Sequence, residues 1–190
     1  MILSALGLSG ASGLNAWLPL LVTATLQRIG WVDLDPTWAQ LGDTPVLVAL
    51  AILFVLDFVG DKVPIVDHVL HALGSVIHPV AGTVLFDAQA GSDVSIVVSI
   101  LLGGGSSGLL HAARATARPA VSGTTAGVGA PIMSILEDIA AVLLVIVAFL
   151  IPVVAGFVVI LLLVGAVMAA RHVRRLVKRR SAGKVPAPQR

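Results

Sequence analysis

The chain alternates long apolar runs with short polar or proline-containing segments. The runs cover about residues 2–26, 45–60, 64–86, 94–112 and 131–170. A helix needs about 20 apolar residues to cross a hydrocarbon layer roughly 30 Å thick, and the runs approach or exceed that length. The last run would extend about 60 Å as a single helix, so we expect Pro152 to divide it into two spans. The pattern therefore predicts an all-α polytopic membrane protein with about six transmembrane helices.

The composition favours one membrane domain over a soluble fold. Of the 190 residues, 57% are hydrophobic and 12% are charged, whereas soluble domains carry about 25% charged residues. We expect a transmembrane helical domain over residues 1–170 and a basic tail over residues 171–190. The first 27 residues are uncharged. Because the basic n-region of a signal peptide is missing, the first run is expected to remain as a spanning helix.

Basic residues are unevenly distributed and predict the orientation of the chain. Eight lie in the tail: Arg171, Arg174, Arg175, Lys178, Arg179, Arg180, Lys184 and Arg190. With six spans, Lys62, Arg114 and Arg118 fall on the same side as the tail, and Arg28 falls on the other. The positive-inside rule then places both termini in the cytoplasm, and we expect the chain in the inner (plasma) membrane. We expect the tail to contact anionic lipid headgroups rather than nucleic acid.

A short string of small residues occurs twice, ninety-five residues apart. Gly10-Ala11-Ser12-Gly13-Leu14 in the first run is echoed by Gly105-Ser106-Ser107-Gly108-Leu109 in the fourth. Three spans separate the copies, so they would run in opposite directions, as in the inverted repeats of many transporters. Small residues at mid-span permit close helix packing, and a substrate-lining role is the alternative. The midplane candidates are Gly10, Ser12, Gly13, Asn15, Gly105, Ser107 and Gly108.

Residues 57–79 combine acidic residues and histidines with apolar helices. A charge in lipid costs about 2.5–3.5 kcal/mol, so such side chains usually face a protein interior or a watery cavity. Asp67, His71, Gly74 and His78 follow helical spacing and would form one stripe. Carboxylates attract cations, and histidine exchanges protons near neutral pH. The candidate transport-path or ion-binding residues are Asp57, Asp61, Asp67, His68, His71, His78, Glu137 and Asp138.

A purely structural interpretation of these residues stays open. Asp61 and Asp67 could cap helices and pair with Arg114 or Arg118, which would hold the bundle together at the membrane interface. Glu137 and its neighbour Asp138 could lie near a helix N-terminus, where negative charge is favourable.

The polar pattern resembles a known family. Asp57-x3-Asp61-Lys62-x-Pro64-x2-Asp67, followed by His78-Pro79-x-Ala81-Gly82, is similar to the bacterial integral-membrane family known as domain-of-unknown-function family 4126. The opening GLSGASGLNAWLPLL and the segment from Pro131 to Glu137-Asp138 resemble it too. The resemblance covers about residues 3–170 and implies a fold and a membrane location, without an activity. Asp57 and His78 depart from the glutamate and the basic residue that the family pattern implies.

Catalytic and metal-binding signatures are missing from the sequence. It contains no G-x-S-x-G, no H-E-x-x-H and no Walker motif, so we expect neither an enzyme nor a cofactor. Without cysteine there is no disulfide, thiolate metal site or cysteine nucleophile. Asp57, Asp61, Asp67, His68 and His71 could offer ligands for zinc or manganese. Their spacing matches no established signature, and no metal is predicted.

Three functions fit these observations. The first is a transporter or channel, coupled to a cation or to protons, with a polar path through the second, third and fifth spans. The second is lipid or lipid-phosphate handling, in which Arg114 and Arg118 would hold a phosphate through their guanidinium groups. The third is a non-transporting accessory subunit of a membrane complex. We favour the first, and a homo-oligomer is a further expectation for a bundle this small.

Overall fold

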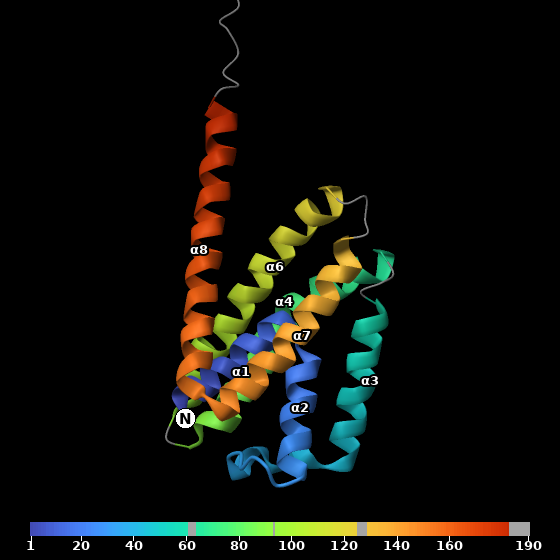
Figure 1. Cartoon of the computed structure of the whole chain (residues 1–190), viewed down its shortest axis with the longest axis vertical. Coiled ribbons are helices and arrows are strands. Elements are labelled where there is room, and N and C mark those ends of the chain that lie inside the picture. Colours follow the sequence, from blue (N-terminus) through green and yellow to red (C-terminus); the bar gives the residue numbers. More distant parts are fainter. Residues whose placement is uncertain (61–63, 93, 125–128, 183–190) are drawn as a thin grey trace, which may run out of the picture.

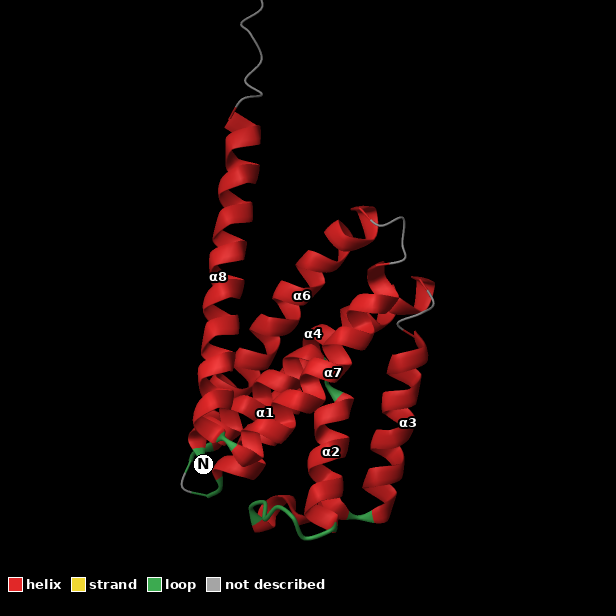
Figure 2. Cartoon of the chain, in the orientation of Figure 1, coloured by secondary structure: helices red, strands yellow, loops and turns green. Residues whose placement is uncertain are grey.

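The described part of the chain is built from helices. The structure is a computed structural model, and it describes residues 1–60, 64–92, 94–124 and 129–182. Every regular element in these ranges is a helix, which confirms the predicted all-α class (Figure 2). The helices are α1 (Ile2–Leu14), α2 (Trp17–Arg28), the 3₁₀ helix η1 (Pro36–Gly42), α3 (Thr44–Gly60), α4 (Pro64–Ala90), α5 (Ile96–Val98), the π-helical η2 (Ser99–Gly104), α6 (Gly105–Thr124), α7 (Gly129–Leu150) and α8 (Pro152–Ala182).

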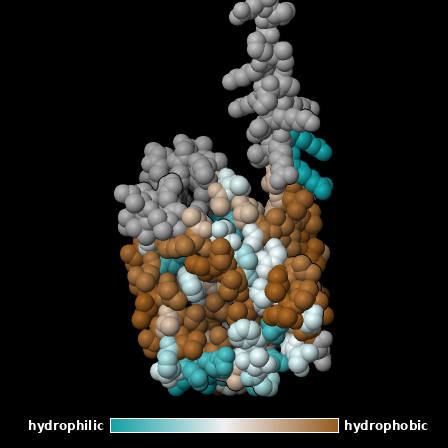
Figure 3. Space-filling model, turned by 180° about the vertical axis from the view of Figure 1, so that it is seen from behind, coloured by the Kyte–Doolittle hydropathy of each residue, from teal (hydrophilic) through white to brown (hydrophobic). Residues whose placement is uncertain are grey.

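Several of these helices could span a membrane. Within the described residues, three are long and apolar enough, at Ile96–Ala117, Pro131–Leu150 and Pro152–His172. A fourth results if η1 and α3, which meet at a bend of 65°, are counted as one span. Apolar residues cover most of the face in Figure 3, while hydrophilic ones gather at its lower end. The membrane character of the chain is thus supported, and the count of six spans is not confirmed.

The last apolar run is divided where the sequence predicts. Helix α7 ends at Leu150 and α8 begins at Pro152, whose missing N–H and fixed φ suit the first turn of a helix. Helix α8 then continues without interruption to Ala182. The boundary predicted at residue 170 therefore falls within a continuous helix, where apolar sequence gives way to basic sequence.

Helix α1 lies at the centre of the bundle, in contact with α4, α6, α7 and α8 (Figure 1). Small residues allow these helices to approach on every side. A Cβ added at Gly7 would lie 2.7 Å from the Cβ of Ala155, and one added at Gly10 would lie 2.4 Å from Cγ2 of Val159. A larger side chain at either glycine would force the helices apart, so the small residues of α1 set the spacing of the bundle.

The first apolar run does not cross the bundle, and its prediction as one spanning helix is wrong. Met1 lines a cavity with Ala90 at the end of α4 and Pro152 at the start of α8. Beyond α2, a guanidinium N–H of Arg28 donates to the Gly42 carbonyl, 2.9 Å away. Gly42 ends η1, and η1 is tied to the same end of α4, because Nε1 of its Trp38 donates to Oδ2 of Asp87 at 2.9 Å. Helices α1 and α2 therefore enter and leave at one end of the bundle, as a hairpin (Figure 1).

Proline explains why the run breaks halfway. In a continuous helix the N–H of residue 19 would donate to the carbonyl of residue 15, but Pro19 has no N–H and its ring would clash with that carbonyl. Asn15 instead takes an extended conformation, with φ −144° and ψ 130°. The chain turns there, and α2 starts at Trp17.

This hairpin changes the path of the N-terminus. Met1 and the far end of α8 lie at opposite ends of the bundle (Figure 1), which does not support the prediction of both termini on one side. The hairpin does not change how the basic residues are divided between the two ends of the bundle. No charged side chain precedes Arg28, so none lies within the part of the chain whose path is altered. Which end faces the cytoplasm remains a prediction.

The two copies of the small-residue string meet inside the bundle. The Oγ atoms of Ser9 and Ser106 are 3.0 Å apart, and the Ser12 hydroxyl donates to Oγ of Ser107 at 2.9 Å. Helices α1 and α6 run in the same direction (Figure 1). The expected opposite orientation of the two copies is therefore wrong. The reason is that α1 ends at the hairpin instead of spanning the bundle. The predicted architecture of two inverted three-helix halves is not confirmed.

Short hydrogen bonds stabilise the end of the bundle at which η1 meets the end of α4. Asp87 accepts a hydrogen bond from the Ser99 hydroxyl at 2.6 Å as well as the one from Trp38. Asp35 caps η1, with the backbone N–H of Thr37 2.9 Å from Oδ1. Hydrogen bonds from the side chain and the backbone of Thr37 lower the pKa of the Asp35 carboxyl.

The hairpin predicts which sites are accessible together. The chain contains no cysteine, so Thr37→Cys, Arg175→Cys and a cysteine added ahead of Met1 can each be labelled singly. We expect a membrane-impermeant maleimide to label the N-terminal cysteine and Thr37→Cys from one side, and Arg175→Cys from the other. Labelling of the N-terminal cysteine together with Arg175→Cys would instead support a first run that crosses the membrane.

The packing of glycines predicts opposite effects at two positions. A Cβ at Gly82 would lie 2.6 Å from the backbone oxygen of Gly103, whereas nothing lies within 4 Å of one at Gly105. We expect Gly82→Ala to lower the free energy of unfolding by about 1–3 kcal/mol. Gly105→Ala should raise it by up to about 1 kcal/mol through helix propensity. Thermal unfolding in detergent checks both, and an equal shift in the two variants would contradict the packing.

Candidate functional site

The break between α1 and α2 is centred on Asn15, whose side chain is almost fully buried. Its Oδ1 accepts the backbone N–H groups of Trp17 at 3.0 Å and Leu18 at 2.9 Å, which caps the start of α2. Its Nδ2 donates to Oδ1 of Asp138 at 2.8 Å and lies 3.4 Å from Oδ2 of Asp57. One amide therefore joins the break to a carboxylate of α3 and a carboxylate of α7.

The open end of α1 is contacted by nitrogen-bearing side chains of other helices. The last carbonyls of a helix lack partners within the helix and carry a partial negative charge. The Leu14 carbonyl accepts a hydrogen bond from the guanidinium of Arg114, and the Ser12 carbonyl contacts Nδ1 of His78. Side chains of α6 and α4 thus satisfy backbone groups that a continuous helix would have paired.

Arg114 is held inside the bundle by an ion pair. Its Nε lies 2.9 Å from Oε2 of Glu137, and the two side chains are 10% and 11% exposed. Because its guanidinium also binds Leu14, Arg114 links α1, α6 and α7. This placement does not support the predicted role of Arg114 in contacting a lipid headgroup. The side chain of Arg118, its predicted companion, lies outside the described residues.

Two buried histidines stack at the site. The rings of His78 and His111 have centroids 4.0 Å apart and planes inclined by 26°. Gly74 lies against this pair, since a Cβ there would come within 2.7 Å of Cε1 of His111. The sequence prediction missed His111 as a site residue. A signal was available, because His111 precedes the charged Arg114 by three residues, a spacing that places both on one helical face.

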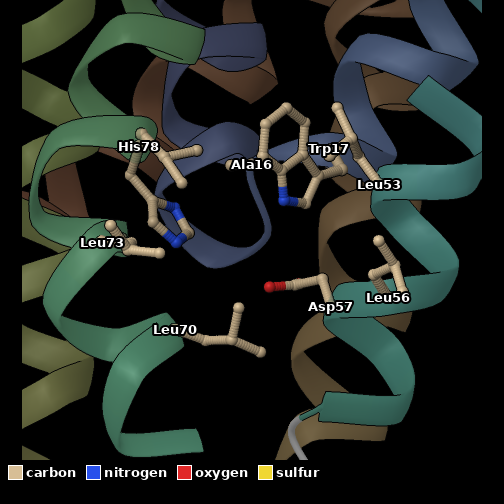
Figure 4. A pocket seen from close by; sticks show the side chains of 10 residues that line it. Ala16, Trp17, Leu53, Leu56, Asp57, Leu70, Leu73 and His78 are labelled. Atoms are coloured by element: carbon tan, nitrogen blue, oxygen red, sulfur yellow. The ribbon is translucent and has the colours of Figure 1, made fainter. Parts of the chain in front are cut away.

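A cavity of about 170 Å³ adjoins the break. In Figure 4 the carboxylate of Asp57 points across it toward the ring of His78, with the indole of Trp17 above them. The described residues that line it are Ala16, Trp17, Leu53, Leu56, Asp57, Leu70, Leu73, Gly74, Ile77 and His78. The cavity therefore combines a mainly hydrocarbon wall with an acidic group and an imidazole.

The structure gathers part of the predicted path. Asp57, His78, Glu137 and Asp138 come together around Asn15, from α3, α4 and α7. Asp61 lies outside the described residues. The side chains of three further candidates on α4 also lie outside them, namely Asp67, His68 and His71. The predicted stripe is therefore observed only at Gly74 and His78, which are both buried.

The small-residue candidates pack helices together instead of lining the cavity. A Cβ at Gly13 would lie 2.8 Å from the Ser107 carbonyl oxygen, and one at Gly108 would lie 3.0 Å from Cγ of Pro79. Gly10 and Ser12 make the contacts described above. Gly105 has open space around it, so it takes no part in either role. Among the midplane candidates whose side chains the structure describes, Asn15 binds the carboxylates of Asp57 and Asp138. The hydroxyl of Ser107 donates to the backbone carbonyl of His78 at 2.7 Å.

A metal centre finds no support in the described part of the chain. No group of three or more histidine, aspartate or glutamate side chains there is placed to hold an ion. The carboxylates are instead separated by the amide of Asn15 and by the guanidinium of Arg114.

Comparison with known proteins identifies a family. No curated protein and no solved structure matches the chain. A family model does match, over residues 2–172, and it is described as a domain of unknown function (DUF4126). The match covers α1 to α7 and α8 as far as residue 172, including the break at Asn15 and the stacked pair His78 and His111, and it confirms the resemblance drawn from the sequence. The chain therefore belongs to the DUF4126 family.

Proposed function

We propose that this protein is a small transporter or channel of the inner membrane, coupled to a cation or to protons. The observation that carries the proposal is the interrupted helix α1–α2, whose break is held between two carboxylates by Asn15. Irregular backbone at membrane depth is tolerated where it is buried in protein or lines a watery cavity. In many transporters, such breaks supply the groups that bind substrates and ions.

The charges at the break support the same function. Acidic side chains inside a membrane bundle are costly, and they commonly mark ion pathways or proton relays. Asp57 faces the cavity, and Asn15 connects it to Asp138. The adjacent Glu137 is neutralised by Arg114. We assign the attraction of a cation to the Asp57–Asn15–Asp138 group, in which one amide holds two carboxylates.

Two histidines lie next to this group of polar residues and add imidazole rings to the site. His78 lines the cavity and stacks on His111. An imidazole ring can both accept and donate a proton, which is the chemistry that a proton relay needs. A proton that enters the cavity would therefore meet a carboxylate and an imidazole on facing walls.

The lipid-phosphate alternative receives less support. It needs a guanidinium directed at a phosphate group, and the guanidinium of Arg114 binds Leu14 and Glu137 instead. The accessory-subunit alternative would require neither a cavity nor an interrupted helix. Flux through the purified protein separates these possibilities.

The proposal predicts a carboxylate-dependent flux. In proteoliposomes tested with a panel of cations and a proton gradient, we expect the native chain to conduct. Asp57→Asn and Asp138→Asn should each reduce the rate about 10- to 100-fold, because one contact to a charged group is worth about 1.5–3 kcal/mol. Initial rates at matched protein density give the measurement.

Asp43→Asn is the matched control for this experiment. Asp43 is exposed and directly precedes α3, the helix that carries Asp57, and asparagine preserves its capping ability. Its flux should equal that of the native chain. Absence of flux in the native protein under every gradient, or equal flux in all four proteins, would overturn the proposal.

A further inference from the structure

We propose that the cavity beside the α1–α2 break binds a small organic amine with an apolar body about the size of a benzene ring. This inference rests on the proposed function for its part in transport, since it names the class of substrate. Binding itself can be measured without transport. The size, lining, charge and position of the cavity each support this class of ligand.

The size of the cavity limits the ligand. Its volume is about 170 Å³, and an engineered apolar cavity of about 150 Å³ is known to hold benzene. A single aromatic ring or a short branched chain therefore fits, together with one ammonium group. Larger ligands would have to displace Trp17 or the leucines of α3 and α4.

The lining of the cavity selects an apolar body. Leucine and isoleucine residues from α3 and α4 are five of its ten described lining residues, and the indole of Trp17 adds an aromatic face (Figure 4). Burying a hydrocarbon body against such a wall is favourable by about 25 cal/mol per Å² of apolar surface removed from water. A fully hydrated ion would gain nothing from these contacts.

Charge at one end of the cavity selects an ammonium group. The Asp57 carboxylate faces the interior and can accept charge-assisted N–H hydrogen bonds. The Trp17 indole can attract a cation over its face. When Nδ1 of His78 donates to the Ser12 carbonyl, its Nε2 is an acceptor, which suits an N–H donor better than an anion.

A bare metal ion fits this lining less well. Calcium takes six to eight oxygen ligands, and magnesium requires near-octahedral oxygen coordination. Among the described residues of the wall, Asp57 is the source of carboxylate oxygens. An amine needs one such partner, and its hydrocarbon body occupies the remaining space.

The position of the cavity suggests how an apolar amine would enter. Leu56 of α3 and Leu73 of α4 both line the cavity and are 60% and 52% exposed. Their exposure places one margin of the cavity on the apolar outer surface, between α3 and α4. A ligand dissolved in the hydrocarbon layer could reach Asp57 from that side.

Binding of benzylammonium to the purified full-length chain in detergent tests the inference. We expect titration calorimetry to detect binding, weakened at least tenfold by Asp57→Asn and unchanged by Asp43→Asn. Benzyl alcohol, which matches the shape without the charge, should bind at least tenfold more weakly. Sodium chloride and magnesium chloride should weaken benzylammonium binding no more than choline chloride does at the same ionic strength.

A second variant keeps the test independent of the stability of Asp57→Asn. Leu73→Trp would fill the cavity from its exposed margin while Asp57 is retained, and it should also weaken binding at least tenfold. Equal affinity for benzylammonium and benzyl alcohol, or native affinity in both Asp57→Asn and Leu73→Trp, would overturn the inference.

The two proposals fail in different ways. Binding of benzylammonium without flux of any solute would retain the amine site and overturn transport. Carboxylate-dependent flux of protons or inorganic cations, with no benzylammonium binding, would retain transport and overturn the amine site.

Discussion

The structure depends on satisfying the backbone where α1 stops. Inside an apolar bundle, each unpaired carbonyl or N–H costs free energy comparable to a lost hydrogen bond. Asn15 meets the requirement at the start of α2, and Arg114 and His78 meet it at the end of α1. Each of these side chains also contacts another polar side chain, and these additional contacts together build the site.

Close packing imposes the second constraint. Glycine, alanine and serine make up much of α1, so four helices can approach it closely. Serine hydroxyls at the contact with α6 bond to one another, which keeps these polar atoms satisfied without charge. The charged part of the polar cluster therefore lies at one end of α1, while the rest of that helix is held by close packing and by uncharged serine hydrogen bonds.

Apolar runs predicted the helices well, because composition dominates when most residues of a segment are hydrophobic. The division at Pro152 follows from length and from one proline. The hairpin was missed although Pro19 marks it, because the run around it is long enough to cross a membrane. Sequence length alone does not distinguish a crossing from an entry and return, since that depends on which carbonyls find partners in other helices.

The site was predicted in part for a similar reason. Asp57, His78 and the Glu137-Asp138 pair stand out as polar residues in apolar runs, and they do meet. Their partners could not be assigned, because contacts between Asn15 and Asp138, or between Arg114 and Leu14, join residues 123 and 100 positions apart. His111 became a site residue only through its stacking on another helix.

The central place of α1 has a consequence for biogenesis. Chains emerge from the ribosome N-terminus first, so α1 is made before any of the four helices that surround it. Its terminal carbonyls must wait for His78 and then for Arg114, and Val159 of α8 comes later still. Helix α1 is thus synthesised well before its packing can be completed, because its contacts with α8 form only after that helix has been made.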